Sequence, residues 1–263
     1  MEIILKSHLD KYYDSLIEYK HIASRLNTVF LKDIEKYNTP DSILHLGSSL
    51  ILKDWSGRSD NGWAYTYPTD SKICTNKDNY SEFINDLLSK QFCLMYAQSF
   101  EGLERFFKNL IFECAEIDEE LKTIVKIELK KKNQIFCRKN IPSGNSLLEI
   151  INKLFDSFSY QKDILQFDLK DSFFVLSETR HNIIHNDYIL SKSKIFCSTN
   201  KKNLFVDLFE YKPIKKNEIK VNLDIEKFKR LMDFMCEFTF QILKKTCLKY
   251  DLNWKLYKNM DKI

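Results

Sequence analysis

One nine-residue segment, ETRHNIIHN, concentrates side chains that can transfer protons and bind anions. Two of the five histidines, His181 and His185, stand four residues apart, and Arg180, one of six arginines, directly precedes the first. On a helix, offsets of three, four and seven residues return to nearly the same face, so Glu178, Asn182 and both histidines share about a third of the circumference. An imidazole gives and takes a proton near neutral pH. The segment therefore predicts either acid–base chemistry or a polar helix face turned to solvent.

Arg180 has a different position on the same helix. It falls on the stripe that should face the core or a partner subunit, among the apolar residues Phe173, Leu176, Ile183 and Ile184. A guanidinium keeps its charge, so there it must extend to solvent, pair with an acid or bind an anion. Two interpretations follow: a packed arginine bonded to a carboxylate, or a phosphate ligand with His185 close enough to move protons.

A metal site is the third possibility for this segment. Glu178, His181 and His185 could ligate one ion from successive turns. However, Asn182 stands where an HExxH motif has its general-base glutamate, and no further histidine or nearby cysteine completes the set. The sequence therefore predicts no metal and no cofactor.

Hydrophobic periodicity predicts the elements that position this segment. Apolar residues at helical spacing predict six helices, at about residues 3–37, 81–111, 117–132, 146–155, 171–188 and 224–250. Ser81 is the expected N-cap of the second helix and Asp224 that of the last. Residues 38–79, richer in Gly and Pro, predict irregular structure or short strands at 42–52 and 63–67. Residues 203–211 and 218–222 predict a β-hairpin, and 157–170 have no clean period. We expect a mainly α fold, an antiparallel helical bundle with a small β-hairpin insertion before the last helix. The division is a helical extension and irregular segment over 1–79 and a helical domain over 80–263.

Composition limits the function classes. The 263 residues include only 5 Gly and 4 Pro, which disfavours turn-rich β-sandwiches and Gly-rich phosphate loops. The net charge of +4, from 41 basic and 37 acidic residues, does not by itself indicate nucleic acid. The chain has neither an uninterrupted apolar run of about 18 residues nor a secretion signal, so we expect a cytoplasmic protein without membrane contact. Seven scattered cysteines predict reduced thiols rather than disulfides: Cys74, Cys93, Cys114, Cys137, Cys197, Cys236 and Cys247.

The residues from Glu178 to Asn186 resemble the RxxxxH motif of the HEPN superfamily, in the form in which a polar residue, here His181, follows the arginine. The resemblance covers about residues 81–250, and its specific part is under a dozen residues. It implies an antiparallel helical bundle with the motif on one helix. It also implies metal-independent RNA cleavage in many members and non-catalytic RNA or protein binding in others, frequently in toxin, antitoxin and antiphage systems.

Residue by residue, the resemblance assigns catalysis to Arg180 and His185. It also implies that His181 occupies the polar position that supports the active form, and that Asn186, next to His185, is a further supporting residue. Glu178 would orient or balance the arginine. The 2′-hydroxyl of RNA would be the nucleophile, and a cyclic phosphate would result. A homodimer would join two motif helices in one composite site, and an antitoxin or regulatory protein is a further expected partner.

Basic side chains outside the motif are weaker candidates for RNA contact. One cluster contains Lys130, Lys131, Lys132, Arg138 and Lys139, and a second lies near the predicted hairpin at Lys201, Lys202, Lys212, Lys215 and Lys216. Most such runs are solvated surface. Tyr188 and Trp63 could stack on bases, although structural roles are the commoner use of such aromatic residues.

Overall fold

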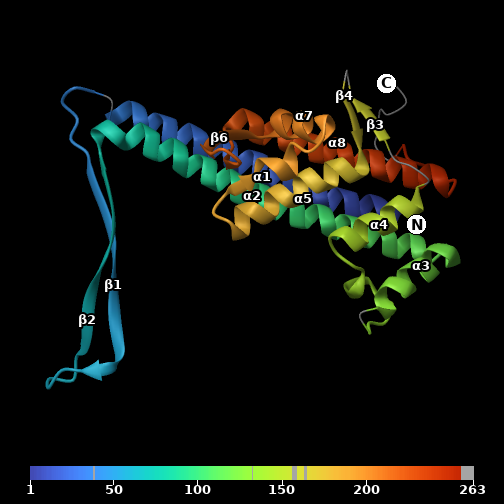
Figure 1. Cartoon of the computed structure of the whole chain (residues 1–263), viewed down its shortest axis with the longest axis horizontal. Helices are drawn as coiled ribbons and strands as arrows, with labels where there is room; N and C mark the ends of the chain where they lie inside the picture. The colour runs from blue at the N-terminus through green and yellow to red at the C-terminus, as the bar shows by residue number, and fades with distance from the viewer. Residues whose placement is uncertain (38, 132, 156–158, 163–164, 256–263) are drawn as a thin grey trace. The chain divides into compact units, whose positions relative to one another are not determined.

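The computed structural model describes residues 1–37, 39–131, 133–155, 159–162 and 165–255. Within these ranges the chain forms eight α-helices, one 3-10 turn and seven short or long strands in three antiparallel sheets, so the expectation of a mainly α protein is confirmed (Figure 1). None of the described helices combines the length and the apolar character that a membrane crossing requires. In chain order the elements are α1 (Glu2–Tyr37), β1 (His45–Arg58), β2 (Ala64–Asn76), α2 (Lys77–Ala115), α3 (Glu119–Lys130), η1 (Arg138–Asn140), α4 (Asn145–Leu154), β3 (Ser159–Lys162), β4 (Leu165–Asp168), α5 (Leu169–His185), β5 (Ile189–Ser191), α6 (Lys192–Ile195), α7 (Thr199–Leu208), β6 (Glu210–Lys215), β7 (Glu218–Asn222) and α8 (Ile225–Lys249).

The chain divides into two compact units. One comprises Met1–Ser24 with Ser89–Ile263, and the other is Arg25–Leu88. The predicted division between residues 79 and 80 stays a prediction.

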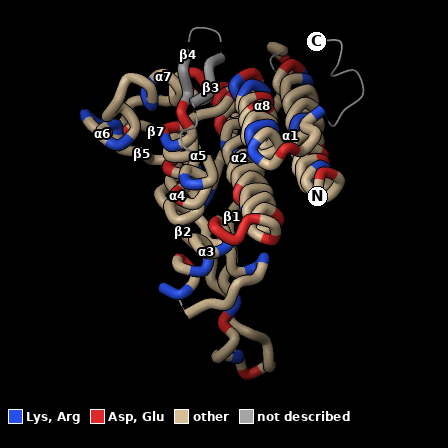
Figure 2. Tube along the Cα trace, turned by 90° about the vertical axis from the view of Figure 1, so that its right-hand side faces the viewer, with Lys and Arg blue, Asp and Glu red and all other residues tan. Residues whose placement is uncertain are grey.

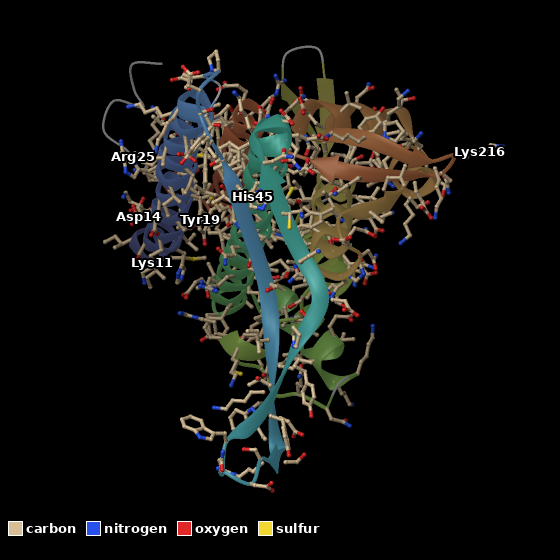
Figure 3. All side chains as sticks on the ribbon, turned by 90° about the vertical axis from the view of Figure 1, so that its left-hand side faces the viewer. Lys11, Asp14, Tyr19, Arg25, His45 and Lys216 are labelled. Carbon is tan, nitrogen blue, oxygen red and sulfur yellow. The ribbon has the colours of Figure 1, made fainter. Side chains whose placement is uncertain are left out.

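The unit Arg25–Leu88 contains the end of α1, the β1–β2 hairpin and the start of α2. Tyr80 donates a hydrogen bond to the Asp33 carboxylate, and its ring meets Tyr37 edge-on at 5.4 Å between centroids. The sequence predicted irregular structure or two short strands here, whereas the hairpin runs over 14 and 13 residues. Figure 3 shows side chains standing off both faces of this ribbon. Because nearly all of them are exposed, neither face imposes the alternation of apolar and polar residues by which a strand is recognised.

The core of the other unit is built on the aromatic face of α2. Phe107 lies between α5 and α8, with its centroid 6.4 Å from Phe173 and 6.1 Å from Phe238. The start of α1 packs on the same helix, where the Tyr12 ring stacks on Phe106 at 6.2 Å. Gly102 permits this approach, because a Cβ there would lie 3.1 Å from the Tyr12 ring. Buried aromatic contacts therefore fix α5 against α2.

Several predicted boundaries were wrong: α2 ends at Ala115 rather than at residue 111, and α5 ends at His185 rather than at residue 188. Helix α2 begins at Lys77, before the expected cap Ser81, because the side-chain oxygen of Asn76 accepts the main-chain N–H groups of Asp78 and Asn79. Residues 203–208, expected in a strand, belong to α7, where Ser198 caps the helix.

The later hairpin is β6–β7, which β5 extends to a three-stranded sheet. The unassigned segment contains the short hairpin β3–β4. Asp224 caps α8 as predicted, accepting from the Lys227 N–H at 2.7 Å.

Candidate functional site

Both ends of the motif helix α5 are fixed by local hydrogen bonds. At its start the Asp168 side chain accepts the N–H of Asp171 at 2.5 Å. At its end Asp187 and Tyr188 adopt left-handed backbone conformations, with φ of 49° and 67°, and the Tyr188 N–H bonds the Asn182 carbonyl at 3.1 Å. The helix therefore stops directly after His185, which places the two histidines in its last turns.

The inner side of α5 is held by α2. The buried Tyr96 hydroxyl donates to the Leu176 carbonyl at 2.6 Å, and the Phe100 and Phe173 rings lie 5.5 Å apart. Burial is the largest cause that raises the pKa of Tyr96 well above its ordinary value, so the phenol stays a neutral donor. These contacts orient the motif side chains around the helix axis.

Arg180 lies on the side of α5 that faces α2. Its guanidinium forms an ion pair with Glu101, and the two side chains are 28% and 45% exposed. Its Nε atom is buried and has no hydrogen-bond partner in the described part of the protein. An arginine paired with a carboxylate is one of the two arrangements that we considered for Arg180 from the sequence.

His181 and His185 point outward instead. Both are exposed, and their rings lie 4.8 Å apart with 46° between their planes. The five-residue step from Arg180 to His185 corresponds to a rotation of about 140° around the helix. The structure thus brings the two imidazoles together, and it turns Arg180 and His185 toward different sides of α5.

Glu178, which the resemblance implied would orient or balance the arginine, has other partners in the single chain. Its carboxylate accepts from the Lys194 ammonium at 2.7 Å and from the Asn182 amide at 3.1 Å. Burial acts to raise the pKa of Glu178, but the two hydrogen bonds and the charges of Lys194 and His181 outweigh it, so the net shift is downward. Glu101 is the carboxylate that pairs with Arg180.

Asn182 is the buried polar residue of the motif. It was expected on the polar face with the histidines, but it is only 4% exposed. Its amide donates to the carbonyl and carboxylate of Glu178, and its oxygen accepts from Asn186 at 2.7 Å. Asn186 therefore supports the end of the helix through Asn182.

The first basic cluster is partly neutralised. Lys131 pairs with Glu128 at 2.7 Å, and Arg138 pairs with Glu113 while its guanidinium lies 5.0 Å from the Phe112 ring centroid. Lys130 and Lys139 are exposed, and Lys132 lies outside the described residues.

Charges of both signs also alternate elsewhere in the protein. Figure 2 shows basic and acidic residues interspersed along α1 and α8. Neither α1 nor α8 therefore presents a continuous row of basic residues in this view.

The remaining candidates are distributed elsewhere. Trp63 is 76% exposed on the β1–β2 hairpin, and Tyr188 is half-buried directly after α5. Among the residues that the structure describes, no group of three or more His, Cys, Asp or Glu side chains is placed to hold a metal ion.

The sequence reasoning missed Glu101. It lies 79 residues before Arg180, on a long amphipathic helix in which acidic residues are ordinary surface groups. No local pattern distinguishes it from the other exposed carboxylates of that helix. No protein-family model matches this chain, and no curated protein or solved structure matches it at a significant level.

Proposed function

We propose that the protein is a metal-independent endoribonuclease of the HEPN type, acting as a toxin or antiphage effector, with Arg180 and His185 as its catalytic residues. The observation that carries the proposal is the exposed His181–His185 pair, 4.8 Å between ring centroids, on the same helix as a partly exposed arginine. We also propose that the helices form the antiparallel bundle that the resemblance implies.

The chemistry requires a base, an acid and a cation. A base takes the proton of the RNA 2′-hydroxyl, and the 2′-oxygen attacks phosphorus. The bond from phosphorus to the 5′-oxygen breaks as an acid protonates that oxygen, which leaves a 2′,3′-cyclic phosphate and a 5′-hydroxyl. Arg180 would stabilise the additional negative charge on the phosphorane, and His185 would carry the proton transfer.

A homodimer resolves the different directions of the two side chains. Ile184, one turn after Arg180, is 43% exposed, whereas Phe173, Leu176 and Ile183 of the same stripe are buried. The outer end of the stripe is thus uncovered next to the arginine. A second copy covering Ile184 would bring its own His185 toward this Arg180, so each cleft would draw on two motif helices.

The test is cleavage of RNA by the purified protein in chelator. We expect a cyclic phosphate product, and a loss of kcat of at least about 100-fold in Arg180→Ala and in His185→Ala. Matched controls are Arg105→Ala and His45→Ala, which remove exposed residues of the same types that are not part of the motif. Equal loss in the controls, or full activity in both motif variants, would refute the catalytic assignment.

Mixed dimers test the composite site. A dimer of one Arg180→Ala chain and one His185→Ala chain has one cleft with both the arginine and the histidine and one cleft with neither. We expect it to regain part of the activity that either homodimer lacks.

The second candidate function is a non-catalytic HEPN-like module that binds RNA or a protein. The Arg180–Glu101 ion pair favours it, because that pair occupies the guanidinium in the single chain. Intact RNA across several substrates and pH values, combined with retained RNA binding, would decide for this function.

A further inference from the structure

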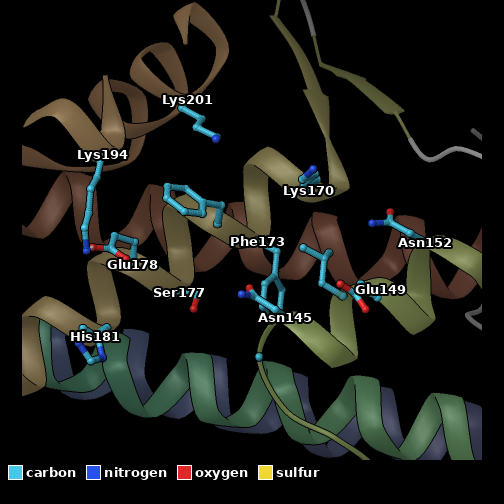
Figure 4. Close-up of a pocket in the computed structure, with 13 residues that line it drawn as sticks. Asn145, Glu149, Asn152, Lys170, Phe173, Ser177, Glu178, His181, Lys194 and Lys201 are labelled. Atoms are coloured by element: carbon cyan, nitrogen blue, oxygen red, sulfur yellow. Dashed lines mark hydrogen bonds and ion pairs between the residues drawn. The ribbon is translucent and has the colours of Figure 1, made fainter. Parts of the chain in front are cut away.

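A cavity of about 680 Å³ lies along α5, and Glu178 and His181 of the motif form part of its lining (Figure 4). The start of α4 and the segment α6–α7 provide its other walls. Lys170, Phe174, Ser177 and His181 line it from α5 at spacings of four, three and four residues, which places them on one helix face. His185 follows one turn later on that face, so the cavity leads to the exposed histidine pair.

Three lysines give the cavity its cationic character. Lys170 is exposed and makes no ion pair with any described residue. Lys194 is held by Glu178, and Lys201 is 18% exposed, with its ammonium 3.5 Å from Asp171. Figure 4 shows Lys194, Lys201 and Lys170 entering from different elements.

Counting Asp171 beside Lys201, carboxylates match the three ammonium groups in number, and Lys170 is the ammonium group that no described carboxylate pairs with. Two carboxylates line the cavity, and that of Glu178 is engaged by Lys194 and Asn182. Glu149 is exposed and lies within electrostatic reach of Lys131. Helix α4 also begins here at Gly144, whose N–H donates to the Glu104 carboxylate at 2.9 Å. The unpaired ammonium group of Lys170 suits a ligand with one phosphate.

The rest of the lining suits a nucleobase. The Phe174 ring has the Lys201 ammonium 4.3 Å from its centroid. The side-chain amides of Asn145 and Asn152 can donate to and accept from base edges. The volume lies within the range of about 300–1,000 Å³ typical of small-ligand sites. Aromatic and amide groups beside a cationic end form a lining suited to a nucleotide.

We propose that this cavity binds one nucleotide of an RNA strand, with its phosphate at Lys170 and Lys201 and its base against Phe174. The assignment of that nucleotide to RNA rests on the proposed ribonuclease function. The neighbouring phosphodiester of the strand would then lie toward His181 and His185. A free mononucleotide is the other source of the same chemistry.

Direct binding to the full chain tests the cavity. The probes are adenosine and uridine 5′-monophosphates and a 2′-O-methyl pentaribonucleotide, which cannot form a cyclic phosphate. We expect Lys170→Gln to weaken pentanucleotide binding about fivefold or more and to reduce the slope of log Kd against log salt by about 0.7. Phe174→Leu keeps an apolar side chain but removes the stacking face, and we expect about tenfold weaker binding.

Lys202→Gln is the matched control, because Lys202 is exposed, adjoins Lys201 and does not line the cavity. We expect its Kd to equal that of the unaltered protein. Equal Kd values for Lys170→Gln and Lys202→Gln would overturn the cavity site. A mononucleotide that binds within about twofold of the pentanucleotide would overturn the assignment to RNA.

His185→Ala separates this proposal from the proposed function. We expect the variant to bind the 5′-monophosphates normally, because they occupy only the cavity and His185 does not line it. Full cleavage of unmodified RNA by the same variant would refute the catalytic assignment while the binding result stands. Loss of mononucleotide binding in His185→Ala would instead overturn the cavity site.

Discussion

Replacing Asn182 tests whether the end of the motif helix depends on a buried amide network. The side chain donates two hydrogen bonds, at 2.7 Å and 3.1 Å, and accepts one at 2.7 Å, while only 4% exposed. Asn182→Ala removes all three bonds. In this variant the Glu178 carboxylate retains its hydrogen bond from Lys194, and the exposed Asn186 amide can form hydrogen bonds with water. The substitution therefore leaves no charged group without a partner. At about 0.5–1.5 kcal/mol for each bond, we expect the free energy of unfolding to fall by about 2 kcal/mol.

Asn182→Asp is nearly isosteric but should cost more at neutral pH. It replaces the donating amide, 3.1 Å from the Glu178 carboxylate, with a second carboxylate. Like charges at this distance repel, and a negative charge near the helix C-terminus is unfavourable. Both effects raise the pKa of the new carboxyl in the folded state. The added loss of stability is therefore present at neutral pH, decreases as pH falls below that raised pKa, and is fully gone only below the ordinary pKa of an unfolded aspartate, about 3.9.

Urea unfolding followed by far-UV circular dichroism, at pH values from 7 down to about 4.5, measures these differences. Asn186→Ala is the control, because it removes only the exposed partner of the Asn182 oxygen, and we expect a loss under about 1 kcal/mol. Equal stability of Asn182→Asp and Asn182→Ala at pH 7, or a difference between them that does not change with pH, would refute the network.

Three further predictions concern the surroundings of the motif. Tyr96→Phe removes the buried hydrogen bond to α5, and urea unfolding should show a loss of about 1 kcal/mol. The Glu178 carboxyl, with its pKa lowered in the folded state, stabilises the protein above its unfolded pKa, and this contribution is lost as pH falls. Lys194→Met should therefore flatten the acid side of the profile of unfolding free energy against pH, while an unchanged profile would contradict the pairing. Burial raises the pKa of the Cys93 thiol to about 12, so iodoacetamide at pH 8 should label the exposed Cys74 and Cys197 before Cys93, as mass spectrometry of the intact fold would show.

The long helices could be predicted because their signals are local. Helix α8 has an acidic cap at Asp224 and apolar residues at helical spacing, and the structure places both as expected. The motif helix was equally recognisable from its own residues. Such elements depend on side chains within one or two turns of each other, which the sequence displays directly.

The failures arose where local signals were misleading or absent. Residues 203–208 contain β-favouring Phe and Val, yet the Ser198 cap and the buried Leu204, Phe205 and Leu208 make that segment the helix α7. Tertiary burial outweighed intrinsic propensity there. The carboxylate of Glu101 could not be assigned to Arg180, because their contact joins residues far apart in the chain.

The Arg180–Glu101 ion pair bears directly on whether the motif can act. Both partners are partly exposed, so solvent screening limits the pair to about 0.2–1 kcal/mol. A phosphodiester would meet the same screening, but the pair with Glu101 is weak enough for a phosphodiester that accepts two hydrogen bonds from the guanidinium to displace it. The terminal nitrogens of the guanidinium can change partner without breaking a bond at Nε, which is buried and has no hydrogen-bond partner among the described residues. Glu101 therefore restrains Arg180 in the absence of RNA without blocking the phosphate contact that the proposed chemistry requires.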